Sequence, residues 1–300
     1  MSFAIHTADV TEWLKTQPES SFDGCFCDPP YAIRFLGADW DRGIPSSTLW
    51  SEVLRVLKPG ASLLAFGGTR AHHRLMCAIE DGGFEIRDIL VWLHAQGFPK
   101  SKVNLKPAVE PIALAMKPVA GTFALNAETY GIGGLNIEGS RTDEGRWPAN
   151  VILDESFSTN TWFRYFYCPK SSRVERDAGL DDFEAKERRT LGGGLTGISG
   201  DRSGFGSASK PLAMGTNTIK NVHPCIKPLA LNRYLANLIL PLPRENSPRR
   251  LLVPFSGSGS EMIGALQAGW DEVVGIEKEP EYVRIAEARI QHWMQPSMAA

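Results

Sequence analysis

The chain has 300 residues, enough for one large domain with an insertion and too few for two large domains. At 43% hydrophobic and 22% charged residues, the composition excludes general disorder. The 32 basic and 34 acidic side chains give a formal charge of −2, which excludes a protein that coats polyanions through a uniformly basic surface. A polyanionic partner would have to bind a local basic groove.

The cysteines and the apolar stretches predict a cytoplasmic protein. Five cysteines are an odd number and the N-terminus has no basic and apolar leader, so we expect no disulfide framework. No apolar stretch reaches the about 18 residues of a membrane span, so we expect no membrane contact. Cys25 with Cys27, and His223 with Cys225, lack a second ligand pair at zinc spacing, so we predict no metal site.

Strand and helix signals alternate over residues 1–118. Residues 22–27 form an apolar run that stops at Pro29 and Pro30, because proline cannot donate to a sheet and keeps its predecessor out of a helix. This predicts a buried strand with Asp28 at its carboxyl end. Other predicted strands are residues 3–5, 61–66, 84–93 and 111–116, and predicted helices are residues 10–15 (opened by Asp9 or Thr11), 47–57 (closed by residues 58–60) and 70–80.

The composition changes over residues 119–222. Glycine and serine dominate residues 190–218, which predicts a mobile loop, because such a segment cannot bury enough apolar surface to offset chain entropy. Apolar and aromatic residues between 151 and 168 predict that part of this region packs on the core.

Regular structure resumes at residue 223. A helix is predicted over residues 229–240, followed by a strand (250–254), a Gly-rich turn (255–260), a helix (261–267) ended by Gly269, a strand (272–276) and a helix (281–293). This alternation predicts an α/β fold, a doubly wound and mostly parallel sheet. We divide the chain into a first α/β half (1–118), an insert (119–222) and a second α/β half (223–300).

The Gly-rich turn is the first candidate binding site. A strand-to-helix turn with an acid after the next strand predicts a site for an adenosine-containing cofactor, with Glu277 placed to bind a ribose diol. A dinucleotide fingerprint would need a third glycine at Met262, so a pyrophosphate site is not favoured. The alternative is an ordinary tight turn with an exposed glutamate. The residues of the turn are Phe255, Ser256, Gly257, Ser258 and Gly259.

The second candidate site is Asp28-Pro29-Pro30-Tyr31. Ligands of α/β sheets bind at the carboxyl ends of strands, where this segment would lie. A carboxylate and a backbone carbonyl side by side can accept both hydrogens of an exocyclic NH2 group, and the Tyr31 ring can stack on a planar base. The structural alternative is a polyproline turn after a strand.

These motifs, in this order, resemble the amino-group DNA methyltransferases of the β type, including phage and prophage members. Asp-Pro-Pro-Tyr comes first, a target-recognition region follows, here residues 119–222, and Phe-x-Gly-x-Gly comes last. The resemblance implies S-adenosyl-L-methionine as cofactor, near Asp9 and near the segment that holds His223 and Lys227. In the family an Asp commonly stands where this chain has Val253, and Glu261 is an acid that could take its role.

The same resemblance implies the reaction: methyl transfer to the N6 amino group of adenine in double-stranded DNA, after base flipping and by direct displacement on the methyl group. Asp at the first motif position favours adenine over the N4 amino group of cytosine. Two other classes stay open, a catalytically silent DNA-recognition subunit and a small-molecule methyltransferase. The resemblance is compatible with a homodimer, a restriction partner is unknown, and we expect the cytoplasm of a bacterial or phage-infected cell.

Local positive charge predicts the contacts with DNA. Acidic residues interleave with the basic ones over residues 173–189, so a solvated helix face explains that stretch equally well. The candidate DNA-binding residues are Lys100, Lys102, Lys106, Arg173, Arg176, Arg188, Arg189 and Arg202.

Overall fold

The computed structural model describes residues 1–33, 39–94, 105, 107–141, 145–153, 171–188, 217–223, 226–245 and 247–295. The strands of the first part of the chain are β1 (Ser2–Thr7), β2 (Phe22–Cys27), β3 (Leu57–Phe66), β4 (Glu85–Leu93), β5 (Val109–Met116) and β6 (Val151–Leu153). The later strands are β7 (Lys186–Arg188), β8 (Asn217–Ile219), β9 (Arg250–Pro254) and β10 (Glu272–Glu277).

The helices lie between these strands in chain order. They are α1 (Val10–Lys15), η2 (Asp39–Asp41), α2 (Ser47–Val56), α3 (His72–Asp81), α4 (Phe123–Tyr130), η3 (Glu138–Ser140), α5 (Arg173–Asp177), α6 (Leu229–Leu238), α7 (Ser260–Ala268) and α8 (Pro280–Met294). Within the described ranges, no helix is long and apolar enough to cross a membrane.

Eight strands form one sheet in the order β1-β10-β9-β2-β3-β5-β4-β6. The pairs from β1 to β3 and the pair β4–β6 are parallel, whereas β5 is antiparallel to β3 and to β4. The prediction of a doubly wound, mostly parallel sheet is therefore confirmed. Because β5 runs against its neighbours, its first residues lie at the edge of the sheet where β2, β3 and β4 end.

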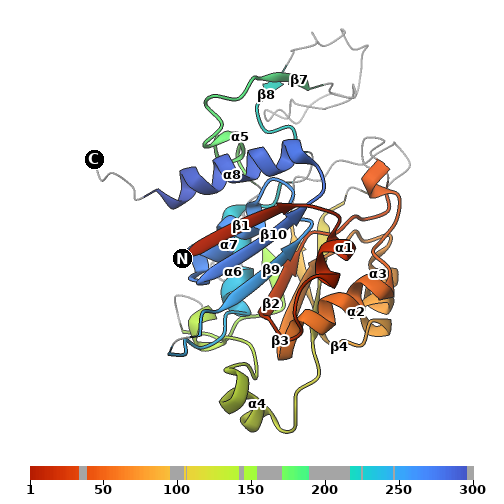
Figure 1. Cartoon of the computed structure of the whole chain (residues 1–300). Coiled ribbons are helices and arrows are strands. Elements are labelled where there is room, and N and C mark those ends of the chain that lie inside the picture. The colour runs from red at the N-terminus through yellow and green to blue at the C-terminus, as the bar shows by residue number, and fades with distance from the viewer. Residues whose placement is uncertain are drawn as a thin grey trace, which may run out of the picture.

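Helices cover both faces of the sheet (Figure 1). Helices α1, α2 and α3 contribute to one apolar core, and α6, α7 and α8 contribute to the other. Side chains of β2 alternate between them, with Cys25 and Cys27 in the first core and Phe26 in the second. This two-sided burial explains why β2 has a continuous apolar sequence.

The two halves of the chain meet at the pair β2–β9. The buried carboxylate of Asp23 on β2 accepts a hydrogen bond from the Arg250 backbone N–H on β9 at 2.8 Å and from Lys58 Nζ on β3 at 2.6 Å. A side chain at Gly24 would come within 2.9 Å of the Trp270 ring, so only glycine fits this close approach. These contacts place the end of β2 beside the end of β9.

Most predicted elements are confirmed with small shifts at their ends, and the larger differences concern three regions. The predicted helix 47–57 ends at Val56, because Leu57, and residues 58–60 that are predicted to close it, already belong to β3. The helix considered for residues 173–189 covers only Arg173–Asp177 and is followed by Gly179 with φ of +80°. Part of residues 119–222 joins the main sheet, since β6 pairs with β4. The predicted mobile loop lies outside the described residues, apart from its last two positions in β8.

Candidate functional site

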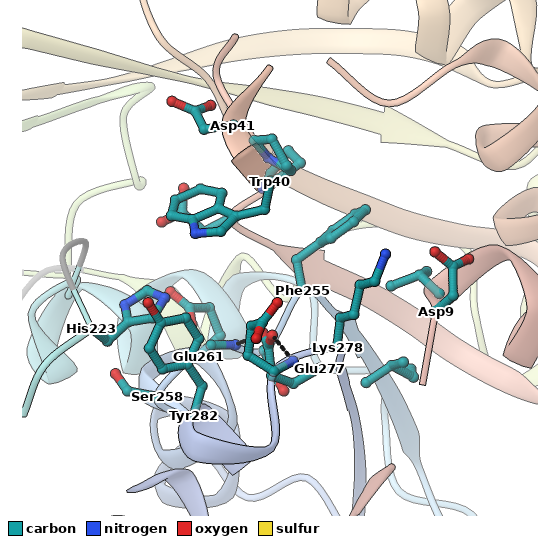
Figure 2. Close-up of a pocket in the computed structure, with 18 of the residues that line it drawn as sticks. Asp9, Trp40, Asp41, His223, Phe255, Ser258, Glu261, Glu277, Lys278 and Tyr282 are labelled. Atoms are coloured by element: carbon teal, nitrogen blue, oxygen red, sulfur yellow. Dashed lines mark hydrogen bonds between the residues drawn. The ribbon is translucent and has the colours of Figure 1, made fainter. Parts of the chain in front are cut away.

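A pocket of about 260 Å³ opens where four neighbouring parallel strands end (Figure 2). Asp28 follows β2, Phe255 follows β9, Glu277 ends β10 and Asp9 comes shortly after β1. The structure thus brings together residues from both ends of the sequence. The predicted site residues that line this pocket are Asp9, Asp28, Pro29, Pro30, Tyr31, His223, Phe255, Ser256, Gly257, Ser258 and Glu277.

The Gly-rich turn at the pocket has a left-handed backbone. Phe255, Gly257 and Gly259 have φ of +60°, +49° and +78°. This conformation suits glycine and strains a phenylalanine by about 1 kcal/mol. The turn is held by the Ser256 N–H, which donates to the Ile276 carbonyl at 3.0 Å, and by the Gly257 N–H, which donates to Glu277 Oε2 at 2.9 Å.

The pocket wall fits a nucleoside. Both oxygens of Glu277 already accept backbone N–H groups, from Gly257 at 2.9 Å and from Glu279 at 2.8 Å (Figure 2). Each oxygen keeps a lone pair that a diol can use, and burial raises the pKa of this carboxyl. The Ser256 hydroxyl also lines the pocket, buried and without a hydrogen-bond partner in the described residues. A buried polar atom of this kind is expected to bind a ligand or water.

The Asp28–Tyr31 segment is held from two sides. The Tyr31 hydroxyl donates to Asp28 Oδ1 at 2.7 Å, and the Tyr31 N–H donates to Asp41 Oδ1, also at 2.7 Å. Asp41 is 1% exposed and comes from η2, and Ala32 has a left-handed φ of +57°. The carboxylate and the ring therefore have fixed positions at the pocket.

Lys227 connects the Asp28–Tyr31 segment to the end of β4. Its ammonium lies 2.5 Å from Asp28 Oδ2, 3.1 Å from the Tyr31 hydroxyl and 3.5 Å from Glu110 Oε2. Glu110 Oε1 lies 3.5 Å from His94 Nε2. At 5% exposure, Lys227 is buried among these charges. We expected Lys227 in the cofactor pocket, but it is not among the lining residues and instead holds Asp28.

A second pair of buried charges lies behind the Gly-rich turn. Glu261 on α7 is 5% exposed and lines the pocket, and burial together with the nearby Asp28 raises its pKa to about 7. Arg289 on α8 is fully buried and donates from Nη1 to the Ser258 carbonyl at 2.5 Å and to the hydroxyls of Ser258 and Ser260 at 3.0 Å. Burial lowers the pKa of Arg289 to about 10.

Tyr31 also lines a second, open groove of about 370 Å³. Its lining includes Arg42 and Arg70, whose side chains are exposed. A side chain at Gly68 would come within 3.1 Å of the Tyr31 ring, so the turn after β3 packs closely on this ring. Tyr31 and Ile33 therefore line both the pocket and a groove that has two guanidinium groups.

The predicted DNA-binding residues are only partly described. Arg173 and Arg176 lie on α5, and neither lines the pocket. Between them, Glu175 Oε1 accepts the N–H of Leu229 at 2.8 Å, so α5 fixes the first turn of α6. Only the backbone of Arg188 is described, in β7, and Lys100, Lys102, Lys106, Arg189 and Arg202 lie outside the described residues.

Some residues of the site were not expected from the sequence. Trp40, Asp41 and Tyr282 line the pocket, and Glu110 approaches Lys227. Asp39-Trp40-Asp41 follows the Asp28–Tyr31 segment by about ten positions, but no periodicity in the sequence reveals that Asp41 contacts Tyr31. Glu110 could have been found only from the antiparallel direction of β5, which brings the start of that strand to the site.

The described residues contain no group of three or more His, Cys, Asp or Glu side chains that could hold a metal ion. The cysteines Cys25 and Cys27 are free thiols buried in β2, and burial raises the pKa of Cys27 well above its usual value.

Comparisons with known proteins agree with this geometry. A family model described as DNA methylase matches residues 22–288. The type II methyltransferase M.HindIII of Haemophilus influenzae is 29% identical over 113 residues, and the match covers 29% of this chain and 37% of that protein. The matched region therefore spans well under half the length of M.HindIII.

Solved structures share the fold over nearly the whole chain. M1.HpyAVI in complex with SAM is 16% identical with a TM-score of 0.55, covering 96% of this chain and 98% of that one. The cytosine-N4-specific PvuII DNA methyltransferase is 15% identical with a TM-score of 0.59, covering 96% and 86%. TTHA0409 of Thermus thermophilus, complexed with S-adenosyl-L-methionine, is 17% identical with a TM-score of 0.52, covering 98% and 97%.

Proposed function

Because this chain belongs to the DNA methylase family, we propose that it transfers a methyl group from S-adenosyl-L-methionine to the N6 amino group of adenine in double-stranded DNA. The observation that carries the proposal is the shared pocket, in which Asp28 and Gly257 lie on one cavity although 229 positions separate them in the sequence. Methyl transfer to a base requires a nucleoside site beside a carboxylate and an aromatic ring.

The residues of the pocket fit the proposed cofactor. Glu277 would bind the ribose hydroxyls, and the Gly257 backbone allows close approach of the ligand. When bound, S-adenosyl-L-methionine supplies an electrophilic methyl group on a sulfonium.

A target base can reach Asp28 only after it leaves the stacked duplex. Tyr31 would then stack on the flipped base, while Asp28 and the Pro29 carbonyl accept the two amino hydrogens. This localises the nitrogen lone pair, and the Asp28 carboxylate stabilises the positive charge that develops on nitrogen. Orientation of this kind contributes up to about 7–11 kcal/mol to a methyl transfer.

Lys227 adds a donor beside these acceptors, because its ammonium lies 2.5 Å from Asp28 Oδ2. Adenine and cytosine both carry an amino group next to an unprotonated ring nitrogen on their Watson–Crick edge. Guanine and thymine carry a ring N–H at that place. An acceptor and a donor side by side therefore favour adenine and cytosine over the other two bases.

Between adenine and cytosine, we choose adenine because Asp28 stands at the first motif position. The second candidate is N4-cytosine methylation, since the charge pattern of Asp28 and Lys227 fits both bases and a cytosine-N4-specific enzyme has the same fold. Double-stranded DNA is the proposed partner, and the homodimer remains a prediction.

The test is to express the chain in cells without endogenous DNA methylation and to sequence their DNA with detection of modified bases. We expect N6-methyladenine in one sequence context. Asp28→Ala should abolish it, whereas binding of S-adenosylhomocysteine, measured by calorimetry, should change less than about threefold. Asp81→Ala, which changes an exposed aspartate at the end of α3, is the matched control and should methylate normally.

Other outcomes would select the alternatives. N4-methylcytosine would establish the second candidate, and an active Asp28→Ala enzyme would overturn the catalytic assignment. No heat with S-adenosyl-L-methionine would favour a silent DNA-recognition subunit. Methylation of small amines but not of DNA would favour a small-molecule methyltransferase.

A further inference from the structure

The buried acids of the pocket differ in how their charges are compensated. Asp41 accepts a hydrogen bond from the Tyr31 N–H, and Glu277 accepts two from backbone N–H groups. Glu261 accepts a long hydrogen bond from the Asn232 side-chain amide at 3.5 Å, and its own backbone N–H also contributes a hydrogen bond. At 5% exposure, Glu261 is thus a buried acid that lines the pocket with little direct hydrogen bonding.

Charged groups from three other elements face Glu261. Asp28 at the end of β2 disfavours its ionised form, whereas Lys227 before α6 and Arg289 on α8 favour it. Lys227 contacts Asp28, and Arg289 Nη1 contacts Ser258 and Ser260. The Nε and Nη2 atoms of Arg289 have no hydrogen-bond partner in the described residues. A cation that enters the pocket would therefore find Glu261 able to accept its hydrogens.

The proposed methyl donor carries such a cation, because its amino-acid end has an α-ammonium. Glu261 lines the pocket together with Glu277, which would hold the ribose (Figure 2). Asp28, which would face the target base, lines the same pocket. The strand before the Gly-rich turn ends with Val253 and Pro254 and contributes no carboxylate.

We propose that Glu261 binds the α-ammonium of the methyl donor, so that the donor binds in its full form only when Glu261 is ionised. The inference rests on the proposed function and names the residue that recognises the amino-acid end of the cofactor. A charge-assisted hydrogen bond at a site this buried is among the stronger polar contacts in proteins.

Binding should therefore depend on pH. The pKa of Glu261 is raised to about 7, so its side chain is mostly neutral at pH 6 and mostly ionised at pH 8. The affinity for a ligand that requires the ionised form should rise about tenfold between these values.

Two thioethers separate recognition of the nucleoside from recognition of the amino acid. S-adenosylhomocysteine has both parts, whereas 5′-deoxy-5′-methylthioadenosine lacks the amino acid. We expect Glu261→Gln to weaken binding of S-adenosylhomocysteine about 10- to 100-fold at pH 8 in calorimetry. Binding of methylthioadenosine should change less than about twofold, and the pH dependence should disappear. Glu281→Gln is the matched control, because Glu281 lies in the first turn of α8, is exposed and does not line the pocket.

Folding of the variant can be checked independently. The raised pKa means that the folded state holds the Glu261 proton more tightly than the unfolded chain, so the charge reduces stability as pH rises from about 4.5 to about 7. Glu261→Gln removes this charge and should melt at or above the wild-type temperature at pH 8.

Each outcome has a distinct meaning. Equal losses for both ligands would make Glu261 a structural residue and overturn the inference. Unchanged binding of S-adenosylhomocysteine would also overturn it, while the proposed function would stand. If the wild-type protein binds neither ligand nor S-adenosyl-L-methionine, the proposed function itself fails.

Discussion

At the scale of single residues, the Lys227 side chain links the Asp28–Tyr31 segment to the rest of the sheet. Its ammonium contacts Asp28 and Tyr31 and lies 4.6 Å from the centre of the Phe66 ring. A lysine buried beside a carboxylate is stabilised by that charge, and it keeps the carboxylate in place for the amino group of a base. In the proposed reaction it also donates to the ring nitrogen next to that amino group.

This role predicts a specific coupling between Lys227 and the target base. Lys227→Met should lower kcat/KM for DNA about 100-fold, more than it weakens the binding of S-adenosylhomocysteine, which it affects only through the lost charge that favours ionised Glu261. DNA with 1-deazaadenine at the target position lacks the ring nitrogen, so it should react about 10- to 100-fold more slowly with the wild-type enzyme. In the Lys227→Met enzyme, 1-deazaadenine in place of adenine should lower the rate little further.

The control is 7-deazaadenine, which keeps the ring nitrogen in question and should react normally with both enzymes. Additive losses for Lys227→Met and 1-deazaadenine would show that Lys227 only positions Asp28.

At the scale of elements, the strand-to-helix unit β9–α7 forms the pocket through its backbone. Gly257 has φ of +49°, and a side chain there would come within 2.7 Å of His223 Nε2. That ring is fixed in turn, since it meets Tyr282 edge-on with 4.6 Å between the ring centres. The turn, His223 and the first residues of α8 therefore behave as one packed unit beside the cofactor.

Gly257→Ala should therefore weaken cofactor binding. We expect at least a tenfold loss in the affinity for S-adenosylhomocysteine by calorimetry, together with about 1–2 kcal/mol lost from the free energy of unfolding. Gly269→Ala is the matched control: Gly269 has φ of +101°, but a side chain there meets its nearest atom only at 3.9 Å and lies outside the pocket lining. It should lose stability and keep its affinity. Equal affinity losses in both variants would mean that backbone strain alone is responsible.

The same elements show how much of the site can be predicted from the sequence. The bounds of β2 and β9 follow from apolar runs stopped by proline and glycine, and Asp28 and Gly257 are therefore placed correctly at strand ends. Glu110 could not be placed, because an apolar run does not reveal strand direction, and only the antiparallel pairing of β5 brings Glu110 near Lys227. The Asp41–Tyr31 contact likewise arises from tertiary packing, which leaves no local pattern.

At the scale of the whole molecule, a formal charge of −2 gives no general attraction to DNA, so the approach of a duplex must depend on where the cations lie. Arg42 and Arg70 line the groove that shares Tyr31 with the proposed cofactor pocket. The chain between β4 and β5 also leaves from His94 and returns at Ala108 at this edge, and it contains Lys100, Lys102 and Lys106. Arg42 and Arg70 therefore place positive charge beside Tyr31, where a flipped nucleotide would bring its flanking phosphates, whereas Lys100, Lys102 and Lys106 lie outside the described residues.

We predict that Arg42 and Arg70 each neutralise about one phosphate next to the target nucleotide. Changing either residue to alanine should then weaken DNA binding for all sequences and reduce the slope of log K against log salt by about one. Binding of S-adenosylhomocysteine should be unaffected, because neither arginine contributes to the cofactor pocket. Arg87→Ala is the control, because Arg87 is exposed near the start of β4, at the edge of the sheet opposite the site. For this variant the slope of log K against log salt should match that of the wild type. Slopes that remain unchanged for Arg42→Ala and Arg70→Ala would mean that the duplex approaches Tyr31 from another side.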